Sequence, residues 1–377
     1  MRPEPQFRPF PLARAPLYTR WWIAGAVLMA LVGGGGVMLR PFIEPRLAAL
    51  LGACLLLVWM LLLLARTLYY RLNQHLAQAY REEVERQQQR WWTWHRQPVA
   101  LIEAVLIGPM GSSFAQWRRV LAGKEAPPVP SQEGAGAALR LLQVFGGEAA
   151  ERERQLAQLL VQAWRQQQPE EVVMQPLRCY WQGSPSAWEA FAGQLALDFP
   201  DVQLPAQPEP WQGLASITAI IDCLHGAAED ARVLCAGCQS TVATAGAALP
   251  AGEAAVLWLL GTSGDVRFAR GEWLSAGAEE PAAVARRAQR QSGLEEAPEA
   301  CVSFSPPEEL ALEGLEWNLP HHRQDAHFGE LQGLQAMVTQ TLAACFARQH
   351  GKPCAWLARD PQHDLAMGIV SADETTS

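Results

Sequence analysis

Two long stretches near the N-terminus contain no charged residue: WWIAGAVLMALVGGGGVML (21–39) and LAALLGACLLLVWMLLLLA (47–65). As a helix, each would be about 28 Å long at about 1.5 Å per residue, enough to cross the hydrocarbon core of a bilayer. The connection RPFIEPR (40–46) contains two prolines, which end helices and favour a turn. The pattern therefore predicts a transmembrane helical hairpin over residues 21–66. A cleaved signal peptide would need a shorter apolar run than the first stretch.

Arginines on either side of the two stretches predict their orientation. More of them flank the outer ends of the pair than the short connection, where Glu44 offsets two arginines. The outer ones are Arg2, Arg8, Arg14, Arg20, Arg66 and Arg71. By the positive-inside rule, the N-terminal segment (1–20) and everything after residue 66 are expected on the cytoplasmic side. The protein would then cross a bacterial inner membrane twice, with both termini in the cytoplasm. Trp21 and Trp22 would then lie at the membrane interface.

Residues 67–97 continue the helical pattern beyond the second stretch. Leu68, Leu72, Leu76, Tyr80 and Val84 recur about every four positions, which predicts a juxtamembrane amphipathic helix that ends by Pro98. Near its end come three tryptophans, namely Trp91, Trp92 and Trp94. They can lie on the bilayer surface, bind a partner protein, or pack this helix against the domain that follows.

From Pro98 onward, short apolar runs alternate with helical periodicity, which predicts an α/β domain over residues 98–370 with its sheet covered on both faces, and a tail over 371–377. Strands are expected at 99–107, 171–181, 232–235, 254–260, 301–306, 353–357 and 367–370. Helices are expected at 113–122, in one or two pieces over 134–167, at 184–197 with a capping serine, and at 216–225, 281–291 and 331–350.

Composition narrows the function classes. A chain of 377 residues exceeds the prior of about 150 residues per domain, so two or three units are expected. The formal net charge of −8, with scattered rather than clustered basic residues, argues against a nucleic-acid partner.

The sequence contains few motifs for chemistry. CAGC (235–238) has the spacing of a redox dithiol or half a zinc site, but the other cysteines do not form a second ligand pair, and its apolar surroundings favour packing. We find no Walker loop, no HExxH and no GxSxG. No metal and no cofactor is expected.

Four stretches, in order along the chain, resemble the β-ketoacyl synthase or thiolase-like fold. They are VLIGPMGSSFAQWRRVLAGKEAPPV (105–129), ASITAIIDCLHGAAEDARVLCAGCQS (215–240), PAGEAAVLWLLG (250–261) and HFGELQGLQAMVTQTLAACFARQHGKPCAWLARD (327–360). The resemblance implies a layered α/β fold and a nucleophilic cysteine at the N-terminus of a buried helix, where the helix dipole lowers the thiol pKa. It also implies two histidines, or a histidine and an asparagine, that stabilise the enolate.

This chain departs from that pattern. The position of the nucleophile falls near Trp211 or Gln212, where there is no cysteine. His327 lies near the position of the second histidine and is the one fallback catalytic candidate, whereas His321 and His322 lack the surrounding glycine and threonine of the first motif. We therefore predict a degenerate condensing-enzyme domain without a complete catalytic set.

The plan of two spans, a tryptophan-rich segment and a degenerate thiolase-like domain also resembles the type VI secretion lipase adaptor family. That resemblance implies a membrane-anchored, non-catalytic adaptor or chaperone that binds a phospholipase effector and helps load it on the secretion spike protein. Its partners would be the effector, the spike and the lipid bilayer. The alternative is a membrane-bound, ketosynthase-like acyltransferase acting on acyl thioesters.

Overall fold

The computed structural model of the chain describes residues 5–38, 44–168, 174–275, 277, 279–306, 312, 314–319 and 322–373. They divide into two compact units, Arg2–Trp92 and Thr93–Ser377. Most of the predicted connection between the two spans, His321 and most of the C-terminal tail lie outside the described residues.

The first unit contains two helices, α1 (Tyr18–Met38) and α2 (Pro45–His95), the second of which runs on into the next unit. Among the described residues, one helix is long and apolar enough to cross a membrane, the part of α2 from Ala49 to His95, and the most apolar window of this segment is not buried. Length and composition are the only grounds for this assignment. The membrane hairpin therefore remains a prediction.

The second unit is built on one eleven-stranded mixed sheet, counted over the described residues. Its strands in chain order are β1 (Val99–Ile107), β4 (Arg178–Gln182), β5 (Glu209–Pro210), β6 (Arg232–Ser240), β7 (Glu253–Gly261), β8 (Val266–Phe268), β9 (Glu272–Leu274), β10 (Ala300–Ser303), β11 (His322–Arg323), β12 (Cys354–Ala358) and β13 (Leu365–Ala372). Their order across the sheet is β11-β10-β12-β13-β8-β1-β7-β6-β4-β5, and β9 pairs with β13.

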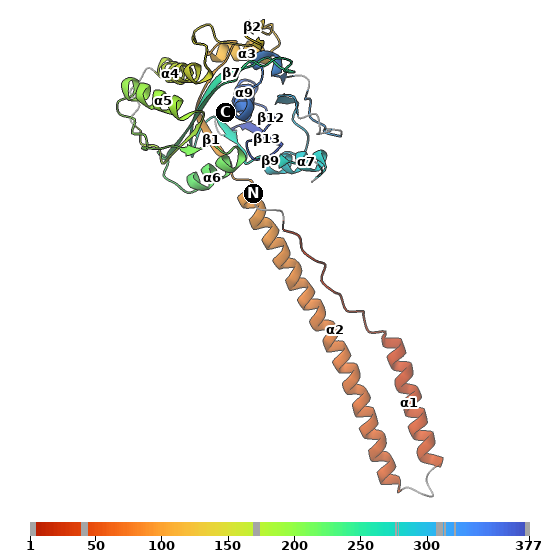
Figure 1. The fold of residues 1–377 in the computed structure, drawn as a ribbon. Coiled ribbons are helices and arrows are strands. Elements are labelled where there is room, and N and C mark those ends of the chain that lie inside the picture. Colours follow the sequence, from red (N-terminus) through yellow and green to blue (C-terminus); the bar gives the residue numbers. More distant parts are fainter. Residues whose placement is uncertain are drawn as a thin grey trace. The chain divides into compact units, whose positions relative to one another are not determined.

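Alternating residues of the central strands enter different cores. Val105 and Ile107 of β1 pack in a core with α4 (Ala149–Gln167) and α5 (Pro185–Asp198), whereas Leu106 between them faces a core on the other side. Because both faces are covered, the central strands are mostly apolar, and Glu103 in the middle of β1 accepts a hydrogen bond from the indole of Trp164. Figure 1 shows α4 and α5 on one side of β1 and β7, and α9 on the other.

Two helices form the central layer, α6 (Leu214–Leu224) and α9 (Gln335–His350), packed against residues from both halves of the sheet. A further helix, α7 (Pro281–Gln291), covers the outer face of β12 and β13. Nearly every residue of α9 is buried, which suits a helix enclosed between two sheet halves. The second unit thus has the layered mixed α/β arrangement that the resemblance to condensing enzymes implies.

Most predicted elements are confirmed within a few residues, and β1 and α7 match their predicted bounds. The prediction of helix from residue 134 is wrong. Residues there form a small hairpin of β2 (Ser131–Glu133) and β3 (Gly136–Ala138), because Gly134 adopts φ +51° in the turn, and helix α4 begins only at Ala149. The remaining short helices are α3 (Phe114–Leu121) and α8 (Asp325–Phe328).

Candidate active site

A sharp strand-to-helix turn precedes the buried helix α6. Strand β5 ends at Pro210, and the turn consists of Trp211, Gln212 and Gly213, after which the helix begins at Leu214. Gly213 has φ +59°, and a Cβ at this position would lie 1.8 Å from Oδ2 of Asp360. Only glycine fits this turn, which we call the α6 elbow (residues 211–213).

The N-terminus of α6 is already capped by a carboxylate from elsewhere in the chain. Asp360 is 8% exposed, and its Oδ2 accepts a hydrogen bond from the backbone N–H of Leu214 at 3.0 Å. Its Oδ1 accepts another from Gln362 N–H at 3.0 Å. Because helix N-termini favour negative charge, this carboxylate takes the place in which an external anion, such as a tetrahedral oxyanion, would be stabilised.

The elbow carries no thiol. Trp211 is buried, and its ring lies edge-on to Tyr180 and Trp258, with centroids 6.3 and 5.6 Å away. Gln212, the other position at which the nucleophile was sought, is exposed. An amide side chain cannot attack a thioester, so this elbow has no group for covalent catalysis.

The segment that caps α6 also borders a cavity of about 540 Å³. Its walls come from the segments after β6, β10 and β12 and from the start of α9, at Thr241, Ser305, Arg359 and Gln335. Arg359 lines the cavity and the following residue, Asp360, caps α6, so the segment after β12 reaches both features. This volume lies within the range of small-ligand sites, which measure roughly 300–1,000 Å³.

The polar groups of the cavity are held by neighbouring backbone. The backbone of Glu330 bonds to Pro250, Gly252 and Thr241, which fixes its position. Its Oε1 accepts from Gln332 N–H at 3.1 Å and from Nε2 of Gln335 at 3.4 Å. Ser305 donates its N–H and its hydroxyl to the buried carboxylate of Asp325, so this serine is held in place rather than activated by a base.

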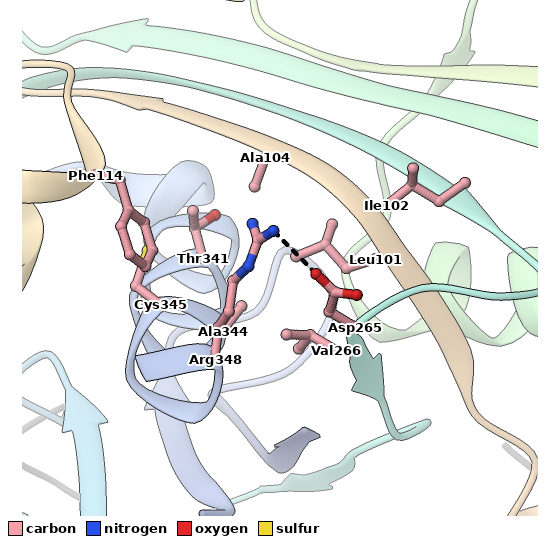
Figure 2. A pocket seen from close by; sticks show the side chains of 10 residues that line it. All are labelled: Leu101, Ile102, Ala104, Phe114, Asp265, Val266, Thr341, Ala344, Cys345 and Arg348. Atoms are coloured by element: carbon pink, nitrogen blue, oxygen red, sulfur yellow. Dashed lines mark hydrogen bonds and ion pairs between the residues drawn. The ribbon is translucent and has the colours of Figure 1, made fainter. Parts of the chain in front are cut away.

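A second hollow contains a cysteine but is too small for a substrate. It measures about 50 Å³ and lies between β1 and α9. Figure 2 shows its lining, with the ion pair between Arg348 and Asp265 (2.9 Å) on one side and Cys345 near Phe114 on the other. Burial raises the pKa of the Cys345 thiol to about 12, so the thiolate needed for attack does not form at neutral pH.

The structure places His327 on α8, outside the residues that line the large cavity. Burial lowers the pKa of its imidazole. Neither ring nitrogen has a hydrogen-bond partner among the described residues. His322 is buried in β11, with its ring 5.7 Å from that of Phe346. The two histidines lie in different elements, and neither lines the large cavity.

The two cysteines of CAGC both lie on β6 but enter different cores. Cys235 packs in the central core, and Cys238 packs on the opposite face with α4 and α5. Residues three apart on a strand point to opposite faces, so this pair cannot share a metal ion or form a disulfide. Burial raises both thiol pKa values well above the usual range.

The tryptophans singled out in the sequence lie in different environments. In the first unit, the rings of Trp21 and Trp22 lie 6.4 and 6.3 Å from that of Trp59. Trp91 and Trp92 contact each other edge to face at 4.7 Å.

In the second unit, Trp94 packs within the domain. Its indole N–H donates to Asp222 at 3.0 Å, and the guanidinium of the fully buried Arg270 lies 3.8 Å from its ring centroid. Arg270 also donates to the carbonyl of Trp94 at 3.0 Å and to the side chain of Gln97 at 2.9 Å. Packing is therefore the role that these contacts support for Trp94.

Sequence reasoning missed Asp360, Glu330, Gln335 and Arg359 as site residues. No local sequence motif around them indicates a chemical role, and only the fold brings Asp360 to α6 and the other three to the cavity. The one local signal was Gly213, since a glycine directly before an apolar helical run is typical of a constrained turn.

No protein-family model matches the sequence, and no curated protein matches it. Solved structures do match. The ishigamide ketosynthase/chain length factor is 15% identical, with a TM-score of 0.52 over 73% of this chain and 99% of that one. The ketosynthase from module 1 of the bacillaene synthase of Bacillus amyloliquefaciens FZB42 is 11% identical, with a TM-score of 0.51 over 75% of this chain and 77% of that one.

These comparisons overturn the adaptor prediction. The similar structures are ketosynthases and a ketosynthase/chain length factor, not secretion adaptors, so the prediction of a non-catalytic adaptor that loads a phospholipase on a type VI spike is wrong. At these identities the likeness shows the fold alone. The chain therefore carries a mixed α/β domain of the thiolase-like, ketosynthase type.

Proposed function

We propose that this chain is a membrane-anchored, ketosynthase-like acyltransferase that acts on acyl thioesters. The observation that carries the proposal is the cavity of about 540 Å³ bordered by the segment that caps α6, with walls from both halves of the ketosynthase-like domain. Apolar residues such as Val242 and Leu249 line it together with polar groups, which suits an acyl chain joined to a polar carrier.

The transfer proceeds without a cysteine-bound acyl intermediate. The elbow has Gln212 where a nucleophile would lie, and no cysteine lines the large cavity among the described residues. Both substrates must then be bound at once, and catalysis rests on positioning and proton transfer rather than on covalent chemistry.

Arg359 is the carrier-binding candidate. Its side chain is exposed at the cavity, and no ion pair to it occurs in the described part of the chain. A guanidinium binds phosphate in a forked geometry, so it suits the phosphate groups of coenzyme A or of a phosphopantetheine arm.

The test uses the full chain in detergent micelles with two donors, octanoyl-CoA and octanoyl-N-acetylcysteamine, of which only the first carries phosphates. Arg359→Ala should weaken binding of octanoyl-CoA about five- to tenfold, equivalent to about 1 kcal/mol, and leave the second donor unaffected. Intact-mass analysis during turnover should show no acylated protein. Failure of both donors to bind, or an acyl adduct on a cysteine, would contradict the proposal.

The anchor is proposed to be a two-span hairpin with both ends in the cytoplasm. Contacts within the first unit support the hairpin, because the segment before α1 runs beside the part of α2 that follows its most apolar stretch, and the arginine bias supports the orientation. Tyr80 donates its hydroxyl to the carbonyl of Arg8 at 2.8 Å, and Asn73 accepts from the N–H of Ala13 at 2.7 Å. A C-terminal alkaline phosphatase fusion should be inactive and a C-terminal green fluorescent protein fusion bright, and the reverse pattern would refute this topology.

A further inference from the structure

The large cavity contains hydrogen-bond acceptors that have no donor. Gln335 is 1% exposed, it lines the cavity, and its Oε1 has no partner among the described residues. The orientation of its amide is fixed by chemistry, because its Nε2 lies 3.4 Å from Oε1 of Glu330, and a carboxylate accepts only from the nitrogen. The amide oxygen of Gln335 is therefore available to accept a hydrogen bond from a ligand.

Glu330 supplies a second acceptor beside it. The hydrogen bonds to its carboxylate reach Oε1, and Oε2 receives none from the described residues. The unpaired amide oxygen of Gln335 is buried and therefore destabilising, whereas the carboxylate of Glu330 is half-buried, so a ligand that donates to both oxygens is favoured here.

From these two acceptors we infer that the cavity binds a primary amine, and that this amine is the acyl acceptor. The inference rests on the proposed acyl transfer. A hydroxyl has one proton and can satisfy only one of the two oxygens, whereas an ammonium group has three and can satisfy both at once. A carboxylate also attracts the positive charge, and Glu330 is positioned to accept the proton that the amine must lose before it attacks.

The reaction balances without further reagents. Glu330 accepts one proton from the bound ammonium, and the free amine attacks the thioester carbonyl carbon. The C–N bond forms and the C–S bond breaks, and the thiolate that leaves takes the second nitrogen proton. The products are an amide and a free thiol, and the proton on Glu330 returns to solvent.

The first experiment measures amine binding without an acyl donor. Saturation-transfer NMR on the full chain in micelles should detect n-butylammonium, and the signal should fall at least tenfold in Glu330→Gln. The control Glu296→Gln changes an exposed glutamate outside the cavity and should bind as the wild type does. Absence of binding to the wild type, or equal binding to Glu330→Gln, would overturn the inference whatever becomes of the acyltransferase proposal.

The second experiment measures transfer from octanoyl-CoA to n-butylamine or to n-butanol, with mass spectrometry for the amide and the ester. We expect N-butyloctanamide, no ester, and at least a tenfold loss of kcat in Glu330→Gln. Gln335→Leu should raise KM for the amine more than it lowers kcat. Ester or free octanoate without amide refutes the amine acceptor while leaving acyl transfer standing. Amine binding without any use of octanoyl-CoA refutes the transfer itself, and with it the acceptor role.

Discussion

The carboxylate of Asp360 accepts a hydrogen bond from the backbone N–H of Leu214, across 146 positions of the chain. This contact joins the segment after β12 to the first turn of the buried helix α6. It places a negative charge at the N-terminus of α6, where the helix dipole stabilises it. The residue before Asp360, Arg359, lines the cavity on which the proposed function rests.

The Asp360 contact should couple energetically to Gly213. Asp360→Ala removes the acceptor for one buried and one partly buried N–H group and should cost about 1–3 kcal/mol of the free energy of unfolding. Gly213→Ala should cost more in the wild type than in the Asp360→Ala background, because the new Cβ would lie 1.8 Å from Oδ2 of Asp360. Urea unfolding of the four proteins tests this, with the exposed Asp230→Ala as control. Additive effects would contradict the steric coupling.

Trp94 and Arg270 should stabilise the second unit together. Arg270→Lys keeps the charge but loses the planar fork that bonds to the Trp94 carbonyl, Gln97 and Asp222, so we expect a loss of about 2 kcal/mol or more. Trp94→Ala should have a similar effect, since it removes the cation–π contact and apolar packing. Thermal unfolding measures the stability of both variants. The control Phe145→Ala, at an exposed position, should leave the melting temperature unchanged. Unchanged stability of Trp94→Ala would show that the tryptophan does not pack the domain.

His327 should make the protein less stable in mild acid. The pKa of its imidazole is lowered in the folded state. At neutral pH and above, His327 is therefore uncharged in both the folded and the unfolded protein and does not reduce the free energy of unfolding. As the pH falls below about 6.5, the unfolded chain takes up the proton first and stability is lost. His327→Gln should therefore lose less stability between pH 7.5 and pH 5 than the wild type in urea unfolding. Parallel pH profiles would refute this.

The same substitution tests a catalytic role for His327. The residue does not line the large cavity, so His327→Gln should keep acyl transfer at pH 7.5 within about twofold of the wild type. A loss of more than tenfold in a variant of normal stability would make His327 part of the site after all.

The cysteines of the ketosynthase-like domain should be unreactive while it is folded. Burial raises the thiol pKa of Cys235, Cys238 and Cys301 well above the usual range and that of Cys179 to about 12, whereas Cys223 is partly exposed. Iodoacetamide at pH 8 should label Cys223 first among these residues, as peptide mass spectrometry would show, and the others only after unfolding. Early labelling of Cys238 would instead indicate an accessible CAGC pair.

The sequence by itself determined most of the secondary structure, because its signals are local. Strand β1 was predicted with the correct bounds, since a run that is apolar except for Glu103 suits a strand covered on both faces. The start of α5 was predicted from Ser184, whose side chain accepts from the N–H of Ala187. The ketosynthase-like fold was inferred in the same way, from short stretches in a fixed order.

The tertiary structure decided the site. In the sequence, Asp360 is an ordinary loop residue, and only the position of β12 in the fold brings it to α6. Gln335 is likewise an ordinary helix residue, and its amide oxygen is left unpaired only because α9 is enclosed between the sheet halves. The spacing of CAGC is that of a metal-binding or redox pair, but the motif lies within strand β6, which places its two cysteines on opposite faces of the sheet. Periodicity and capping depend on neighbours a few residues away, whereas a cavity depends on contacts between segments far apart in the chain, and only the folded chain brings these together.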